Sequence, residues 1–185
     1  MSNRHRKKLP CPLPRLWLMT DERVDAVALV AAAKRLPRGK AGIVFRHYRT
    51  DPAVRRALFD ALQAIARRRR LVLMLAGDAR LAAAWRADGV HGDGRLGARP
   101  LLRSYAVHDR REAVAARGGD MCFVSPLFPT RSHPGAPALG RVRFAALAQR
   151  VGTPVMALGG VRAENMGMLK GIGADGWAAI DGLTR

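Results

Sequence analysis

Short apolar segments and longer amphipathic segments alternate along most of the chain. The short segments are rich in Val, Leu, Ile and Ala and show little alternation of polar and apolar residues, which predicts strands covered on both faces. They lie at residues 16–21, 41–48, 70–78, 88–93, 101–107, 121–126, 154–160 and 176–181. Apolar residues recur at helical spacing between most of them, at 24–36, 51–70, 79–88, 109–119, 142–152 and 162–173. Parallel strands joined by helices form a doubly wound open sheet or a closed (β/α)₈ TIM barrel, and eight units favour the barrel.

The chain has 185 residues and is short for such a barrel, which typically needs ~250 residues. The segment GRLGARP between the fourth and fifth strands is too short and too rich in Gly and Pro for a good helix. The sequence also ends directly after the eighth strand, which predicts a truncated or missing last helix. We expect an apolar strip there, covered by a second protomer or by the N-terminal segment. The predicted division is a basic extension at 1–14 and one barrel domain at 15–185.

The formal net charge of +19 raises nucleic acid as a partner. Only five of the 33 basic residues are lysines, so 28 are arginines, and they are scattered except for runs at 4–8 and 67–70. The second run ends a predicted helix, where cations complement the helix dipole. No zinc-finger spacing, aromatic RNA-binding signature or clear helix-turn-helix accompanies this charge. The sequence therefore predicts weak, salt-sensitive adhesion and no specific nucleic-acid partner.

Targeting signals and cysteine chemistry are not evident in the sequence. No apolar stretch reaches 18 residues, and the basic N-terminus precedes no adequate signal-peptide core, which predicts a cytoplasmic protein. Cys11 and Cys122 have neither metal-ligand spacing nor a disulfide framework. Cys122 lies within an apolar strand, where a buried inert thiol is expected.

Polar and glycine residues gather at the carboxyl ends of the predicted strands, where barrels place their chemistry. Gly159 and Gly160 follow the seventh strand, and backbone amides there often bind phosphate, although a tight turn is the alternative. We therefore expect Gly160→Asp to abolish phosphate binding while leaving the fold intact. Residues 123–140, FVSPLFPTRSHPGAPALG, form a long loop stiffened by four prolines. Long loops of this kind are usually functional or disordered, and the prolines favour a site.

Four further side chains at the predicted rim are candidates for chemistry. Asp78, after the third strand, is a candidate Mg²⁺ ligand, and an N-cap of the following helix explains it equally well. Arg46, after the second strand, has the geometry to hold a diphosphate through two hydrogen bonds. His108 and His133 are candidates for proton transfer near neutral pH, although structural hydrogen bonding is the commoner role of a lone histidine.

Several segments together resemble the superfamily of thiamine phosphate synthase and TenI. They cover roughly residues 15–183 and read LWLMTD, ADGVH, VHDRREAVAARGGD, SPLFPTRSHPGAPALG, PVMALGGV and GADGWAAI. The loop sequence is the specific part. The resemblance implies that this loop covers a thiazole phosphate, with hydroxyls from Thr130 and Ser132 and amides from Gly159 and Gly160. Synthases of the family join a pyrimidine methyl diphosphate to a thiazole phosphate, which implies Mg²⁺ and cations to neutralise the departing diphosphate.

The sequence departs from the family pattern mainly on the diphosphate side. The motif Gln-x-Arg-Glu-Lys becomes VFRHY at 44–48, which keeps only Arg46, and Asn-Asp becomes Gly77 and Asp78. A second metal carboxylate has no clear counterpart, and His133 replaces a lysine of the loop. We therefore expect a synthase with an incomplete diphosphate half-site. Its expected ligands are thiazole phosphate and pyrimidine diphosphate, and its expected protein partner is a second copy of the chain in a homo-oligomer.

Two other hypotheses stay open. A TenI-like thiazole tautomerase, or a thiazole-phosphate binder, would need no metal, and the tautomerase would use His133 or His108 for proton transfer. A basic protein associated with nucleic acid is the remote alternative.

Overall fold

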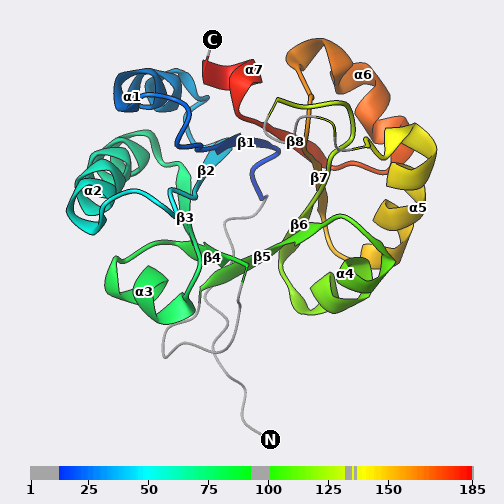
Figure 1. Ribbon diagram of the computed structural model, residues 1–185, viewed down its shortest axis with the longest axis horizontal. Helices are drawn as coiled ribbons and strands as arrows, with labels where there is room; N and C mark the ends of the chain where they lie inside the picture. The colour runs from blue at the N-terminus through cyan, green and yellow to red at the C-terminus, as the bar shows by residue number, and fades with distance from the viewer. Residues whose placement is uncertain (1–12, 93–100, 132–134, 136, 185) are drawn as a thin grey trace, which may run out of the picture.

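The computed structural model describes residues 13–92, 101–131, 135 and 137–184, and eight parallel strands form a closed barrel in them (Figure 1). Each strand pairs with the next in sequence, and β8 pairs with β1 to close the ring. The strands are β1 (Leu16–Met19), β2 (Ala41–Phe45), β3 (Val72–Ala76), β4 (Gly89–His91), β5 (Leu102–Val107), β6 (Met121–Val124), β7 (Val155–Ala157) and β8 (Gly176–Ala179). The predicted barrel is confirmed, and the alternative of an open sheet is wrong.

Helices surround the barrel in the order expected from the amphipathic segments. The main ones are α1 (Ala26–Arg35), α2 (Pro52–Arg69), α3 (Ala79–Ala84), α4 (Arg110–Ala115) and α5 (Gly140–Val151). After β7, one α-helical turn stands between two 3₁₀ turns, as η2 (Ala163–Asn165), α6 (Met166–Leu169) and η3 (Lys170–Ile172). Aspartates cap α1 to α4 by accepting hydrogen bonds from backbone amides of the first turn. None of the helices in the described ranges is long and apolar enough to cross a membrane.

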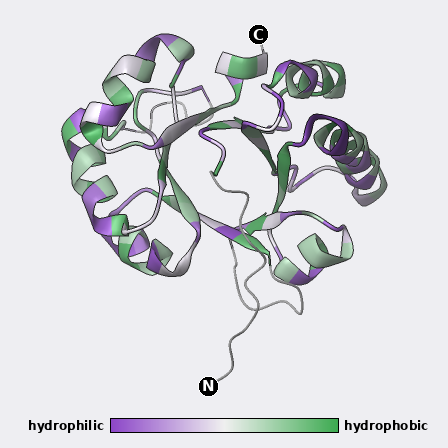
Figure 2. Ribbon diagram, turned by 180° about the vertical axis from the view of Figure 1, so that it is seen from behind, coloured by the Kyte–Doolittle hydropathy of each residue, from purple (hydrophilic) through white to green (hydrophobic). Residues whose placement is uncertain are grey.

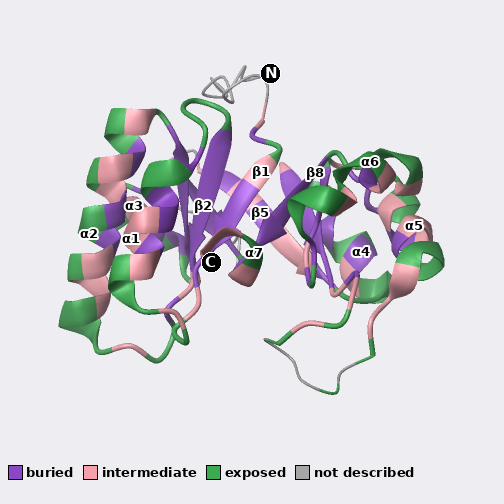
Figure 3. Ribbon diagram, turned by 90° about the horizontal axis from the view of Figure 1, so that it is seen from above, coloured by how far each residue is buried: buried purple, intermediate pink, exposed green. Residues whose placement is uncertain are grey.

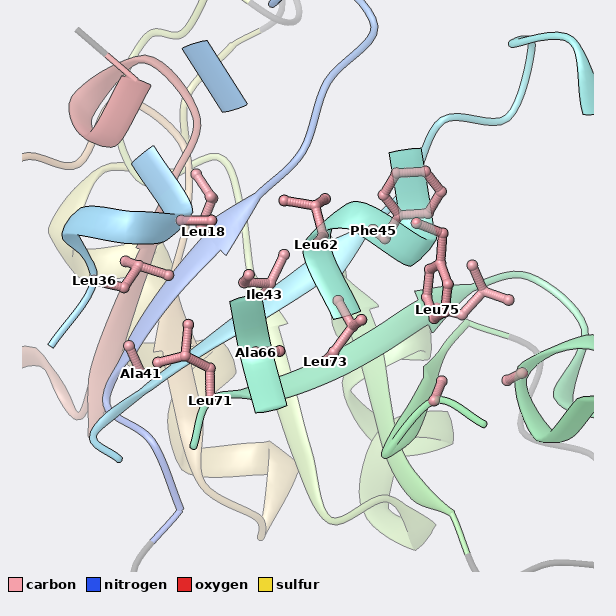
Figure 4. Close-up of a cluster of buried hydrophobic side chains, with 14 of the residues drawn as sticks. Leu18, Leu36, Ala41, Ile43, Phe45, Leu62, Ala66, Leu71, Leu73 and Leu75 are labelled. Atoms are coloured by element: carbon pink, nitrogen blue, oxygen red, sulfur yellow. The ribbon is translucent and has the colours of Figure 1, made fainter. Parts of the chain in front are cut away.

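The apolar residues form two outer cores and one interior core. One outer core packs α1–α3 against β1–β4 (Figure 4), and the other packs α4–α6 against β5–β8. In Figure 3 the strands are mostly buried and the helices are exposed on their outer faces, and Figure 2 shows the matching alternation of hydropathy along the helices. Trp17, which is fully buried, fills much of the interior with Phe123 against its ring edge at 5.7 Å between centroids. The interior is therefore packed below the carboxyl ends of the strands.

The last unit of the barrel ends in a short helix. Residues after β8 form one helical turn, α7 (Asp181–Thr184), which lies between α1 and α6 in Figure 1. Leu183 of this turn packs against both outer cores, and its carbonyl accepts a hydrogen bond from Arg35 Nη2 at 3.2 Å. The expectation that no helix follows β8 is therefore wrong. The predicted basic extension lies almost wholly outside the described residues.

Candidate functional site

A cavity of about 570 Å³ opens at the carboxyl ends of the strands. This volume is in the range of small-molecule sites. Its wall comes from strand ends and following loops around most of the barrel. The lining residues are Met19, Arg46, Tyr48, His91, Ala106, His108, Phe123, Ser125, Pro126, Pro129, Thr130, Arg131, Leu158, Gly159, Gly160, Val161, Arg162, Ala179, Ile180, Asp181 and Gly182. Most candidates from the sequence are thus brought together around one space.

The glycines after β7 and the loop after β6 are held together by backbone hydrogen bonds. Leu127 N donates to Leu158 O at 2.8 Å, and Phe128 N donates to Gly159 O at 3.0 Å. Gly159 and Gly160 have φ angles of +92° and +64°, which favour glycine. In the described part of the chain, the amides of these two glycines donate no hydrogen bond. Both residues line the pocket, where free backbone amides are groups that can bind an anion.

Substitution of Gly160 would disturb the loop itself. A Cβ atom at Gly160 would lie 2.6 Å from Pro129 O and 2.8 Å from Phe128 Cβ. Gly160→Asp would therefore displace the loop that covers the site, and the expectation that the fold stays intact remains a prediction. The glycines are required by this close approach whether or not they bind phosphate.

The charge of the pocket wall is positive in the described residues. The lining contains three arginines, Arg46, Arg131 and Arg162, and one carboxylate, that of Asp181. Arg131 Nε lies 3.9 Å from Asp181 Oδ2, so this carboxylate is partly neutralised. Phosphorylated ligands match such a wall.

Arg46 is held in place by the residues that follow β1. Its Nε donates to Thr20 O at 2.9 Å, and its Nη2 donates to Asp21 Oδ2 at 3.2 Å. Burial lowers the pKa of Arg46, and the charge of Asp21 opposes this shift. Burial alone would raise the pKa of Asp21, but hydrogen bonds and charge from Arg23, with the charge of Arg46, bring it below the usual value. The pair is therefore ionised, and its side chains are only 20% and 16% exposed.

The other predicted side chains have different outcomes. Thr130 lines the pocket, whereas Ser132 and His133 lie outside the described residues. His108 also lines the pocket, is half exposed, and its Nδ1 lies 2.9 Å from Glu112 Oε2 one helical turn later. The roles of all four stay predictions. Cys122 is buried, which raises the pKa of its thiol to about 12, as expected for an inert cysteine.

Asp78 lies at the end of β3 and caps α3. Its Oδ1 accepts a hydrogen bond from Arg80 N at 2.6 Å, and the residue is exposed and outside the pocket lining. The described residues contain no cluster of three or more potential metal ligands. Mg²⁺ is often bound by one or two carboxylates together with substrate phosphates. The described residues therefore do not hold a metal ion by themselves, and an ion at Asp78 would need further ligands from a substrate.

His91 is a pocket residue that the sequence places at the rim but ranks below His108 and His133. It ends β4, is 6% exposed, and its Nδ1 lies 3.0 Å from Ser104 Oγ on β5. Burial lowers its pKa to about 4, and the nearby charges of Arg46 and His108 act in the same direction. His91 is therefore neutral at physiological pH and cannot be the group that titrates near neutrality.

The buried state of His91 predicts a loss of stability in acid. The unfolded chain takes up the proton near pH 6.5 and the folded chain only near pH 4, so stability is present above pH 6.5 and falls as pH decreases below it. Between pH 7.5 and 4.5, we expect the free energy of unfolding of wild type to decrease by on the order of 2 kcal/mol more than that of His91→Gln. Urea unfolding of both proteins at the two pH values measures this. Equal losses would show that His91 is not buried in its neutral form.

The chain is similar to known proteins over most of its length. Residues 16–183 match the family model described as thiamine monophosphate synthase. The thiamine-phosphate synthase of Methylococcus capsulatus is 32% identical over 95% of this chain and 84% of its own length. That of Methylobacillus flagellatus is 30% identical over 96% and 90%, respectively. The structure of thiamine phosphate pyrophosphorylase from Pyrococcus furiosus superimposes with a TM-score of 0.75 over 92% of this chain and 87% of its own, at 23% identity, which supports the fold.

The matches cover the whole barrel, and the same segments carried the resemblance that was noted in the sequence. Both the family model and the two relatives extend across the pocket-forming loops after β6 and β7. The chain therefore belongs to the thiamine monophosphate synthase family.

Proposed function

We propose that this chain is a thiamine-phosphate synthase that couples a pyrimidine methyl diphosphate to a thiazole phosphate, with a reduced diphosphate half-site. The pocket is the observation that carries the proposal. It combines guanidinium groups and available glycine amides with a buried apolar floor that includes Met19, Phe123 and Ile180. The polar groups suit two phosphorylated ligands, and the floor suits their rings.

Each half of the pocket has a separate task in this proposal. Gly159 and Gly160 bind the phosphate of the thiazole, with hydroxyls of Thr130 and Ser132. Arg46 binds the diphosphate. The bond between the pyrimidine methyl carbon and a diphosphate oxygen breaks, both electrons leave with the diphosphate, and the thiazole nitrogen takes up the carbon. Cations that stabilise the departing charge therefore lower the barrier.

Mg²⁺ belongs to the same half-site. When bound, it would neutralise part of the diphosphate charge, and Asp78 is the residue we assign to hold it. The family lysines are replaced by Tyr48 and His133, so we expect turnover well below that of a relative with the full pattern. In this proposal, Asp78 and Arg46 compensate part of the activity that is lost with the two lysines.

His108 supports a second candidate, a TenI-like tautomerase. It lines the pocket and is half exposed, so it is accessible for proton transfer to a bound thiazole phosphate. Such a reaction needs neither Arg46 nor Asp78. The two candidates therefore differ in which ligand binds and in which substitution abolishes activity.

Calorimetric titration with thiazole phosphate, and then with pyrimidine diphosphate and Mg²⁺, tests the proposed function. We expect both ligands to bind and slow thiamine phosphate formation to follow. Binding of thiazole phosphate alone, with a Mg²⁺-independent activity that His108→Gln abolishes, would instead support the tautomerase. Binding of neither ligand would contradict both.

Asp78→Asn separates the metal role from the cap role. Asparagine is as good an N-cap as aspartate, so we expect stability to change by less than about 0.5 kcal/mol while Mg²⁺-dependent turnover is lost. Activity measured against Mg²⁺ concentration and urea unfolding give the two quantities. Asp109→Asn, at the corresponding cap of α4, is the matched control and should retain activity. Full Mg²⁺ dependence in Asp78→Asn would remove this residue from the site.

A further inference from the structure

Thr20 is a buried residue that contacts both Arg46 and His47. It directly follows β1 and is 0% exposed. Its carbonyl accepts from Arg46 Nε at 2.9 Å, and its Oγ1 accepts from Arg46 N at 2.9 Å. The same Oγ1 lies 3.0 Å from His47 Nδ1. A single threonine therefore fixes both the backbone and the side chain of Arg46.

The hydrogen bonds of Thr20 determine the state of His47. A buried hydroxyl needs an acceptor for its proton, because an unpaired buried donor is costly. In the described residues, His47 Nδ1 is the one acceptor within reach of Thr20 Oγ1. Thr20 therefore donates to His47, and the ring is neutral with its proton on Nε2. The ring is 5% exposed and stacks on Phe45 at 4.7 Å between centroids, so its position is fixed.

We propose that Thr20 and His47 are positioning residues that hold Arg46 ready for a diphosphate group. The chain of contacts runs from the imidazole through one hydroxyl to the backbone amide of Arg46. It confines the arginine before the anion arrives, so less conformational freedom is lost on binding. This inference rests on the proposed function of Arg46 and adds two residues that do not line the pocket.

Protonation of His47 would break this chain of contacts. Both ring nitrogens would then be donors, and the Thr20 hydroxyl would lose its acceptor. Burial lowers the pKa of His47, the charges of Glu22 and Asp21 oppose this shift, and Arg55 on α2 and Arg46 act with burial. The positioning is therefore intact above pH 6.5 and is lost as the pH falls through the lowered pKa.

Calorimetric titration with inorganic diphosphate tests the role of the hydroxyl. Thr20→Val keeps the shape and removes the hydroxyl, and we expect about tenfold weaker binding. Thr20→Ser restores the hydroxyl and should bind within about twofold of wild type. Ile43→Val, a mild change on β2 that faces the outer core, is the control for general destabilisation and should bind like wild type. Wild-type affinity in Thr20→Val would overturn the proposal.

Substitutions of His47 test the second residue. His47→Phe keeps the stacked ring without an acceptor, and should weaken binding about as much as Thr20→Val, with no further loss in the double variant. His47→Asn keeps an acceptor that does not titrate. As the pH decreases below 6.5, the affinity of wild type for diphosphate should therefore decrease relative to that of His47→Asn. The titration of diphosphate itself affects both proteins equally and cancels in this ratio.

The outcomes separate the two levels of inference. If wild type and His47→Phe bind diphosphate with equal affinity, or if the losses add in the double variant, the positioning role is overturned. The proposed function is not affected by either outcome. No diphosphate binding by wild type overturns the proposed function and the positioning role with it.

Discussion

Replacing Arg46 by methionine is expected to lower kcat/KM for thiamine phosphate formation by ~10²–10³-fold, because a preorganised charge at the departing diphosphate is lost. The other two pocket arginines lie on the opposite loops, and Arg131 already faces Asp181. Neither is positioned by two contacts to the end of β1 as Arg46 is. Steady-state kinetics with saturating Mg²⁺ and calorimetry with inorganic diphosphate measure the effect.

Two comparisons make the Arg46 result interpretable. Arg56→Met removes a guanidinium of α2 that pairs with Asp60 outside the pocket, and kcat/KM should stay within about twofold. Arg46→Lys keeps the charge, but an ammonium cannot reproduce the fork that meets Thr20 and Asp21 together, so only partial activity is expected. Unchanged kinetics in Arg46→Met would place the diphosphate elsewhere.

The fold could be predicted because each unit repeats one simple pattern. All eight strands lie inside the predicted apolar segments, and the five main helices begin within two residues of the predicted starts. The last unit was harder, since DGLT has no helical periodicity and its turn is stabilised by tertiary contacts of Leu183. Residues 162–173 were predicted as one helix, but the structure divides them into three short pieces. Gly167, Gly171 and Gly173 lie in or next to these pieces and weaken a continuous helix.

The motifs GADG and ADGV, which contribute to the family resemblance, have a structural role. Asp88 accepts a hydrogen bond from Leu73 N at 2.9 Å, and Asp175 accepts from Val155 N at 2.8 Å. Asp120, just before β6, accepts from Arg103 N at 2.8 Å in the same way. These carboxylates satisfy backbone amides at the starts of neighbouring strands, at the end of the barrel away from the pocket. Such motifs therefore indicate the architecture and say little about the reaction.

The candidate site could be predicted in part, because strand order alone brings the rim residues together. Arg46, His108 and the two glycines needed only the rule that barrels place their chemistry at the carboxyl ends of strands, whereas Thr130 was identified through the family resemblance of its loop. His91, Thr20 and His47 could not be ranked highly, because their significance depends on hydroxyl partners in neighbouring strands and on burial. The pairs His91 with Ser104 and Thr20 with His47 are 13 and 27 residues apart in sequence. A histidine at a strand end, with a hydroxyl residue in an adjacent strand, was the one available signal.

Gly42→Ala is expected to destabilise the protein by about 3 kcal/mol, the upper part of the usual range for overpacking. A Cβ atom at Gly42 would lie 2.3 Å from Trp17 Cζ3 and 2.4 Å from Cε3. The indole cannot move aside easily, since it is fully buried and its Nε1 donates to Pro14 O at 2.7 Å. Urea unfolding followed by circular dichroism measures the free energy of unfolding.

Trp17→Phe is expected to relieve the clash in Gly42→Ala. The three atoms nearest to the added methyl group all belong to the six-membered part of the indole, and phenylalanine lacks them in that position. Alone, this substitution leaves a cavity and costs on the order of 2 kcal/mol, but in Trp17→Phe with Gly42→Ala the methyl group fills part of that space. The double variant should therefore be at least about 2 kcal/mol more stable than the sum of the single effects predicts. Gly118→Ala, where no atom lies within 4 Å of the added Cβ, should change stability by less than about 1 kcal/mol. Additive effects in the double variant would mean that Gly42 is required for its backbone and not for the space that Trp17 occupies.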